Sequence, residues 1–212
     1  MNTPDSSVPA ECRRWNERYG VEGWFFGDAP SPLLVAALAS APVPGRAGRA
    51  LCLGEGEGRD ALYLAGRGFV VTAIDGAEAG LAKLRARARE LRLSVSTVCA
   101  DLAGYEPAPG AYDLATSFYC HLEPEVRRVV IGRTAAGLRA DGLLVMEGFD
   151  RLQRLRGRTS GGPRDLAVLY EVDELRTELA VWFEDVMVEG GTMEIDYGQH
   201  RGAAEVVRAV AR

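Results

Sequence analysis

Apolar and polar residues alternate in blocks along the middle of the chain. Runs rich in Val, Ile, Leu, Ala and Phe, each the length of a strand, lie between segments with apolar residues at helical spacing. The strand-like runs cover residues 50–53, 69–75, 94–102, 112–119 and 141–149. The helical segments between them cover residues 60–67, 77–93 and 123–140. This alternation predicts a parallel sheet with helices on both faces, wound as a doubly wound α/β domain.

Different patterns occupy the two ends of the chain. Residues 11–20 and 32–40 predict two short helices before the first strand, with an aromatic loop between them. Residues 172–180 predict a last helix. No internal repeat or linker interrupts the pattern, so residues 1–212 are expected to form one domain, with a flexible leader at residues 1–10.

The C-terminal segment predicts an antiparallel β-hairpin. Residues 181–189 and 204–212 are strand-like, and the stretch that joins them is too short for a covering helix. Residues 192–197 extend the first arm. We therefore expect the hairpin at the edge of a mostly parallel, seven-stranded, Rossmann-like sheet.

Composition and charge narrow the function classes. The 212 residues carry a formal net charge of -5, which argues against a general nucleic-acid binder. The four cysteines, Cys12, Cys52, Cys99 and Cys120, lie far apart and predict neither a metal site nor a disulfide framework. No segment has the pattern of a signal peptide or a membrane span, so we expect a cytoplasmic protein without a membrane partner.

Three glycines follow the first predicted strand, in "ALCLGEGEGRDALYLA". Gly54, Gly56 and Gly58 allow positive φ and let a ligand approach the main chain, at the edge where open α/β sheets bind ligands. The dinucleotide fingerprint G-x-G-x-x-G would need a glycine at position 59, where this chain has Arg59. An NAD-binding oxidoreductase is therefore the less favoured interpretation.

The glycine motif resembles the first motif of the class I S-adenosylmethionine (SAM)-dependent methyltransferases. Asp75 at the end of the second strand, "CADL" after the third and "YDLATSFYCHL" around the fourth extend the resemblance over most of the chain from about Trp15. Within that superfamily the chain is most similar to small proteins of the tellurite-resistance and thiopurine-methyltransferase type. Their motifs match Gly58-Arg59-Asp60 and an expected turn at His200-Arg201-Gly202. The resemblance implies SAM as the cofactor.

The resemblance also implies the cofactor-binding residues. Asp75 is expected to bind the ribose hydroxyls, and Asp101 with the Leu102 backbone the adenine edge; a helix N-cap and a turn residue are the alternatives. Trp15 and Tyr19 are expected in a lid formed by residues 11–45. The expected set is Trp15, Tyr19, Gly54, Glu55, Gly56, Gly58, Asp75, Gly76, Asp101, Leu102, Ser117 and Phe118.

One position departs from the family pattern. The family has an acidic residue two positions before the first glycine, where this chain has Cys52, and often a small residue where it has Glu55. Glu55 or Glu57 is a candidate to supply the missing charge from the loop. The alternative is a catalytically weak or degenerate SAM-binding protein.

The residues expected to act on the acceptor lie on the same edge. His121 is the candidate catalytic residue, as a proton acceptor or an orienting group, and a helix cap is the alternative. Residues 150–170 occupy the place of a substrate lid, whose arginines either close over an anionic acceptor or face solvent. The expected substrate-binding residues are Arg59, Tyr119, Arg156, Arg158, Tyr170, His200 and Arg201.

The predicted reaction is in-line transfer of a methyl group from SAM to a small molecule. A thiol, a chalcogen oxyanion or a small acid is the expected acceptor, and positioning supplies most of the catalysis. No nucleic-acid partner is expected, and the sequence predicts no particular oligomeric state.

Overall fold

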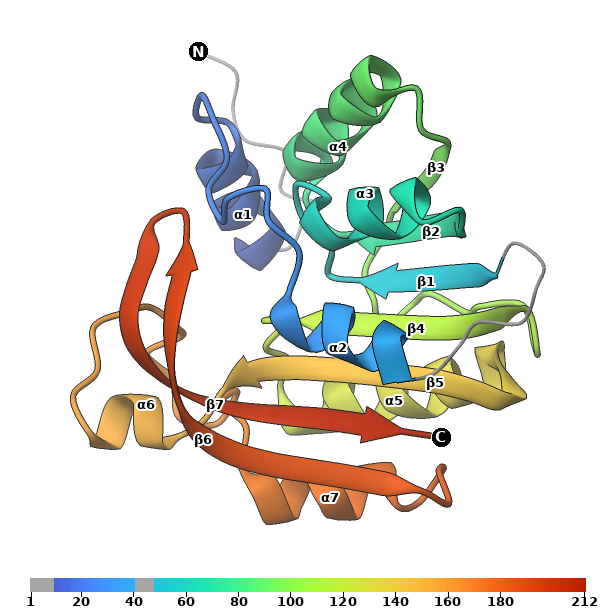
Figure 1. Cartoon of the computed structure of the whole chain (residues 1–212). Helices are drawn as coiled ribbons and strands as arrows, with labels where there is room; N and C mark the ends of the chain where they lie inside the picture. The colour runs from blue at the N-terminus through green and yellow to red at the C-terminus, as the bar shows by residue number, and fades with distance from the viewer. Residues whose placement is uncertain (1–9, 41–47) are drawn as a thin grey trace.

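The computed structural model describes residues 10–40 and 48–212, which form a seven-stranded sheet with helices on both faces (Figure 1). The strand order is β3-β2-β1-β4-β5-β7-β6; β7 pairs antiparallel with β5 and with β6, and the other neighbours are parallel. The strands are β1 (Arg49–Leu53), β2 (Val70–Asp75), β3 (Val95–Cys99), β4 (Tyr112–Phe118), β5 (Leu138–Phe149), β6 (Val186–Tyr197) and β7 (His200–Ala211). The helices are α1 (Ala10–Tyr19), α2 (Pro32–Ser40), α3 (Arg59–Gly66), α4 (Glu78–Leu91), α5 (Pro124–Gly137), α6 (Leu152–Leu155) and α7 (Val172–Leu179).

The predicted mostly parallel Rossmann-like sheet with a C-terminal hairpin is confirmed. Apart from Ala10, the predicted leader lies outside the described residues, as does the loop at 41–47. None of the described helices combines the length and the apolar character needed to cross a membrane.

Several predicted boundaries were wrong. Helix α5 ends at Gly137, where a Cβ would lie 2.7 Å from the Pro107 ring, and β5 begins at once instead of at residue 141. Strand β6 begins at Val186 because the amides at 182 and 183 still donate to the carbonyl of Leu179, at the end of α7. The expected turn at residues 200–202 is the start of β7, since the hairpin turns at Gly198.

Two apolar layers flank the sheet. One packs α5 and α7 against Leu51, Leu144 and Val207, and the other packs α2, α3 and α4 against Cys52 and Val145. Alternate residues of one strand therefore face different layers, as the pleat requires. Both layers end at the carboxyl edge of the parallel strands, which leaves that edge to the loops.

Arg127 joins α5 to α7 through a buried ion cluster. Its side chain is 2% exposed; Nε donates to Glu178 (2.7 Å) and Nη2 to Glu174 (2.9 Å). The guanidinium also lies over the Tyr170 ring, 5.4 Å from its centroid. Removing one partner of such a cluster leaves a buried charge without compensation.

Glu55 fixes the start of α3 from below the glycine turn. Its Oε1 accepts the amide hydrogens of Asp60 (3.1 Å) and Ala61 (2.8 Å), two of the donors that a helix start leaves free. Desolvation, with the nearby Asp60 carboxylate, raises the pKa of Glu55 to about 8. Burial raises the pKa of the Cys52 thiol, and the Glu55 carboxyl beside it raises it further.

Replacing Arg127 with alanine is expected to lower the free energy of unfolding by about 3–5 kcal/mol, because the buried Glu178 would keep only a 3.3 Å contact with the half-exposed Arg128. Urea denaturation followed by circular dichroism measures the change. Arg87→Ala removes an exposed pair with Glu90 and should cost less than about 0.5 kcal/mol. Equal losses in the two variants would contradict the assigned role of Arg127.

Glu55→Gln is expected to remove a pH-dependent loss of stability. A carboxyl with a raised pKa in the folded state binds its proton more tightly there, so stability falls as the pH rises from the unfolded pKa towards about 8. Glutamine keeps the carbonyl that caps α3 and never ionises. The melting temperature of the variant should exceed that of the parent protein by a margin that widens from pH 4.5 to about pH 8 and stays level above that.

Glu55→Ala is the matched control, because it loses the cap at every pH. A constant offset between the parent protein and Glu55→Gln would show that Glu55 does not titrate in this range.

Candidate functional site

The three glycines of the turn after β1 all have a left-handed backbone. Their φ angles are 62° at Gly54, 60° at Gly56 and 95° at Gly58, a region that favours glycine. A Cβ at Gly54 would lie 2.5 Å from the Cys120 thiol, and one at Gly56 would lie 2.4 Å from the Tyr19 hydroxyl. Conformation and crowding therefore both require glycine, and the turn presents bare backbone at the carboxyl edge.

Asp75 ends β2 beside this turn. Its Oδ2 accepts the amide hydrogen of Gly56 (2.8 Å) and its Oδ1 that of Ala77 (2.7 Å). A carboxylate offers about four lone-pair positions, so each oxygen can accept one further donor. Burial raises the pKa of Asp75, and these two amide bonds oppose that shift. The carboxylate thus holds the turn and still suits the two hydroxyls of a ribose.

Helix α1 covers the turn with aromatic rings. Trp15 and Tyr19 stack with their centroids 5.4 Å apart, and Phe26 from the following loop lies 5.9 Å from Trp15 and 6.5 Å from Tyr19. Asn16 accepts the amide hydrogen of Ala79 (2.8 Å), which ties α1 to α4. Electron-rich ring faces near a ligand cavity suit a sulfonium or another soft cation.

The aromatic loop after α1 is fixed by Glu57, a candidate for the missing charge at the turn, and by Lys83, which the sequence did not predict as part of the site. Glu57 accepts the amide hydrogen of Phe25 (2.7 Å) and pairs with Lys83 of α4 (2.7 Å). Lys83 also donates to the carbonyls of Val21 and Gly23, both at 2.7 Å. Lys83 is the single lysine in a sequence with many arginines, and this was the one feature of the sequence that could have pointed to a role for it.

The other expected cofactor residues divide between the edge and the core. Cys12 of α1 packs against Gly76, where a Cβ would lie 2.5 Å from its sulfur. Asp101 lies in the loop after β3, where its carboxylate accepts the amide hydrogen of Ala103 (3.0 Å), and Leu102 packs against the core beside α5. Ser117 and Phe118, at the tip of β4, face opposite sides of the sheet. Glu55 offers only its backbone, because its carboxyl lies under α3.

His121 uses both ring nitrogens within the protein. Nδ1 lies 3.2 Å from the carbonyl oxygen of Val168, and Nε2 accepts the amide hydrogen of Phe149 (3.2 Å). This pattern requires a neutral ring with its hydrogen on Nδ1. Burial lowers the pKa of His121 to about 4, and the charge of Arg127 contributes. The ring joins the tip of β4 to the loop before α7.

Arg156 and Arg158 of the 150–170 segment are paired with a carboxylate. Arg156 and Arg158 both donate to Glu205 of β7, which is 2% exposed, at 2.7–2.9 Å. Tyr170 donates its hydroxyl hydrogen to the carbonyl of Cys120 (2.9 Å). The charges of Arg156 and Arg158 therefore stabilise β7 and are not free for an anion.

The remaining expected substrate residues occupy different environments. Arg59 pairs with Asp60 (2.9 Å) and lies over the Tyr197 ring, 4.7 Å from its centroid. His200 stacks on Phe26, with centroids 4.9 Å apart, so β7 meets the aromatic lid. Arg201 is exposed and pairs with Asp196 across the hairpin. Among the described residues, no three His, Cys, Asp or Glu side chains gather closely enough to hold a metal ion.

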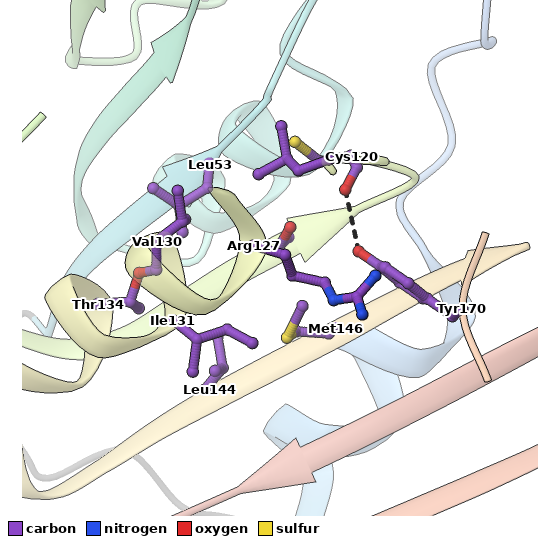
Figure 2. Close-up of a pocket in the computed structure, with 11 residues that line it drawn as sticks. Leu53, Cys120, Arg127, Val130, Ile131, Thr134, Leu144, Met146 and Tyr170 are labelled. Atoms are coloured by element: carbon purple, nitrogen blue, oxygen red, sulfur yellow. Dashed lines mark hydrogen bonds between the residues drawn. The ribbon is translucent and has the colours of Figure 1, made fainter. Parts of the chain in front are cut away.

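A small cavity lies beneath the tip of β4, between α5 and the sheet (Figure 2). Its volume is about 10 Å³, room for one water at most. Figure 2 shows Tyr170 bonded to the Cys120 carbonyl beside the Arg127 guanidinium at one end of the cavity. This cavity is a packing void of the core. The candidate site is the edge formed by the glycine turn, Asp75 and the rings above them.

The chain is similar to known proteins in both sequence pattern and fold. Residues 50–142 match the family model described as a methyltransferase domain. No curated protein matches the sequence. A solved structure from work on the conversion of a disulfide bond into a thioacetal group during echinomycin biosynthesis superposes with a TM-score of 0.72 at 18% identity, over 95% of this chain and 93% of that one.

Two further solved structures have named activities. The Burkholderia thailandensis 1,6-didemethyltoxoflavin-N1-methyltransferase, with 1,6-didemethyltoxoflavin and S-adenosylhomocysteine bound, has a TM-score of 0.68 at 20% identity, covering 100% of this chain and 91% of that one. TehB from Haemophilus influenzae has a TM-score of 0.63 at 21% identity, over 84% of this chain and 60% of that one. At such identities the likeness establishes the fold. Residues 50–142 match a methyltransferase-domain model, and the described chain has the Rossmann-like fold seen in SAM-dependent methyltransferases.

Proposed function

We propose that the chain transfers the methyl group of SAM to a small-molecule acceptor. The observation that carries the proposal is the Asp75 carboxylate, held at the edge of the bare glycine turn by the amides of Gly56 and Ala77. Its two oxygens keep the geometry needed for a ribose diol. The rings of Trp15 and Tyr19 close the same turn from above.

The residues around the turn fit each part of the cofactor. Asp75 would hold the ribose, the loop at Asp101 and Leu102 the adenine, and the backbone at Gly54 and Gly56 the amino-acid portion. When bound, SAM supplies a methyl group already activated by its positive sulfur. The protein therefore needs chiefly to orient the acceptor in line and to exclude water, which can lower a barrier by about 7–11 kcal/mol.

His121 serves this reaction as a positioning residue. Its two hydrogen bonds to the Val168 carbonyl and the Phe149 amide leave no nitrogen free for the acceptor's proton. We assign it the task of fixing the tip of β4, after which Cys120 borders the glycine turn. If the acceptor loses a proton during methyl transfer, that proton passes to solvent, either directly or because the acceptor is acidic enough to be ionised already.

The acceptor is a small molecule, because the described chain adds only loops and a hairpin to the core fold. Thiols, chalcogen oxyanions and small acids are the acceptors that the resemblance first suggests. An anionic acceptor needs open guanidinium groups, and Arg156 and Arg158 are engaged with Glu205. Neutral acceptors are therefore tested alongside the anionic ones.

Asp75→Ala is expected to weaken SAM binding by about 100-fold, since it removes two charge-assisted hydrogen bonds to the ribose. Isothermal titration calorimetry with SAM and with NAD measures the effect. Asp141→Ala is the matched control. Asp141 lies near the amino end of β5, before the stretch that pairs continuously with β4, so this variant should bind like the parent protein. Parent protein that shows no heat with saturating SAM would overturn the proposed function.

Lys83→Met is expected to weaken SAM binding by about tenfold, since Lys83 holds the loop at Val21 and Gly23 and pairs with Glu57 of the glycine turn. Lys83→Arg should restore most of the affinity because it can bridge the same oxygens. Arg87→Met, an exposed change on the same helix, is the control. Equal SAM affinity for Lys83→Met and Arg87→Met would mean that the lid does not contribute to binding.

A degenerate SAM-binding protein is the second candidate function, on the observation that Cys52 stands at the family's acidic position. It predicts SAM binding with no S-adenosylhomocysteine formed from any acceptor. Mass-spectrometric detection of S-adenosylhomocysteine across thiols, selenite, tellurite, small carboxylates and neutral heteroaromatics separates the two.

A further inference from the structure

Buried polar atoms without a partner gather between β4, β5 and the hairpin. They are Tyr119 Oη, Glu147 Oε1, Tyr197 Oη and Arg208 Nε, none of which has a hydrogen bond within the described chain. Glu147 is 1% exposed and Tyr197 is 7% exposed. An unpaired buried polar group costs about 1–3 kcal/mol, so native proteins rarely hold several together.

These atoms belong to one cluster. The rings of Tyr119 and Tyr197 lie 5.6 Å apart, and the amide of Tyr119 donates to the Glu147 carbonyl (2.7 Å). Glu147 and Arg208 face each other in the register of β5 and β7. We call Arg59, Asp60, Tyr119, Glu147, Tyr197 and Arg208 the edge cluster.

Tyr119 is held in a conformation that L residues disfavour. Its φ is 55°, and the only other described non-glycine residue with positive φ is Arg92, at the end of α4. Such a backbone usually persists at functional sites, where the surrounding structure enforces it. Here it places the Tyr119 ring 4.9 Å from Phe149 and above the unpaired Glu147.

The charges around the edge cluster leave no positive surplus. Arg59 is paired with Asp60, and Arg208 binds Glu189 through Nη2 (3.1 Å). The Glu147 carboxyl then has its own charge to balance. Burial raises its pKa, while the nearby Tyr119 hydroxyl, which makes no hydrogen bond of good geometry to it, and both guanidinium groups lower it. An anionic ligand would meet a carboxylate here and no free cation.

The walls beside the cluster are flat. Phe149 lies between Tyr119 and His200, with centroid distances of 4.9 and 6.4 Å, and His200 continues to Phe26 of the lid. Rings in this arrangement bind planar groups by offset stacking and edge contacts. The wall runs from the hairpin to the lid over the glycine turn, so a ligand against it would reach the methyl donor.

We propose that the edge cluster binds the methyl acceptor, and that the acceptor is a planar, uncharged aromatic or heteroaromatic molecule with an N–H or O–H donor beside a carbonyl. Glu147 accepts the donor's hydrogen, and the tyrosine hydroxyls with Arg208 Nε donate to the carbonyl. This inference rests on the proposed function and specifies its substrate class.

The binding test uses the intact chain saturated with S-adenosylhomocysteine. Lumazine, a neutral bicyclic lactam, is the probe, against 2-naphthoate and selenite as planar and compact anions. Lumazine is expected to bind at least about tenfold more tightly than either anion. Tighter binding of an anion, or no binding of lumazine, overturns the proposal.

Glu147→Gln is expected to weaken lumazine binding by about tenfold or more and to leave SAM affinity within about threefold. Glu194→Gln, an exposed change on β6, is the matched control. A parent protein that binds no SAM refutes the methyltransferase proposal itself. A Glu147→Gln protein that loses SAM but keeps lumazine assigns the cluster to the cofactor and overturns only this inference.

Tyr119→Phe separates a binding role of the hydroxyl from a structural one, because the two roles predict different changes in melting temperature and lumazine affinity. Because its hydroxyl has no partner, the melting temperature should stay the same or rise while lumazine binding falls at least about fivefold. A lower melting temperature with unchanged lumazine affinity would show that the hydroxyl serves the fold, and would overturn the proposal.

Discussion

The turn between β1 and α3 keeps its shape because two carboxyl groups hold its backbone from different sides. Glu55 caps the amides of Asp60 and Ala61 from below, and Asp75 binds those of Gly56 and Ala77 at the edge. Both groups sit where water is largely excluded, so an amide bond there is worth more than at the surface. The lid, the tip of β4 and the start of α3 are all positioned against this turn.

The carboxyl below the turn lies on the loop and not on the strand. The resemblance implies an acid at position 52 and often a small residue at position 55, whereas this chain has Cys52 and Glu55. The Glu55 side chain reaches the start of α3 from the loop and caps it. Burial raises the pKa of Glu55 to about 8, so the cap is largely protonated near physiological pH.

Much of the fold followed from the sequence because it depends on local patterns. The apolar runs and helical spacing gave the parallel strands, and the glycines and Asp75 gave the ligand edge. The features that local patterns did not predict depend on distant contacts: β5 starts at Leu138, after Gly137 has packed on Pro107, and Arg156 and Arg158 bind Glu205, which comes from β7. For the same reason the sequence predicted only Arg59 and Tyr119 of the edge cluster, since Glu147, Tyr197 and Arg208 lie on β5, β6 and β7.

The single lysine of the sequence gives the molecule an unusual chemical handle. Besides the α-amino group at the start of the chain, Lys83 is the one primary amine available to acylating reagents, and it lies under the aromatic loop with its side chain 25% exposed. Coupling through amines, whether to a dye, a sensor surface or a cross-linker, would therefore convert the cation that anchors that loop into a neutral amide. Because nearly all basic residues are arginines, amine-directed reagents act on the one side chain that holds the aromatic loop.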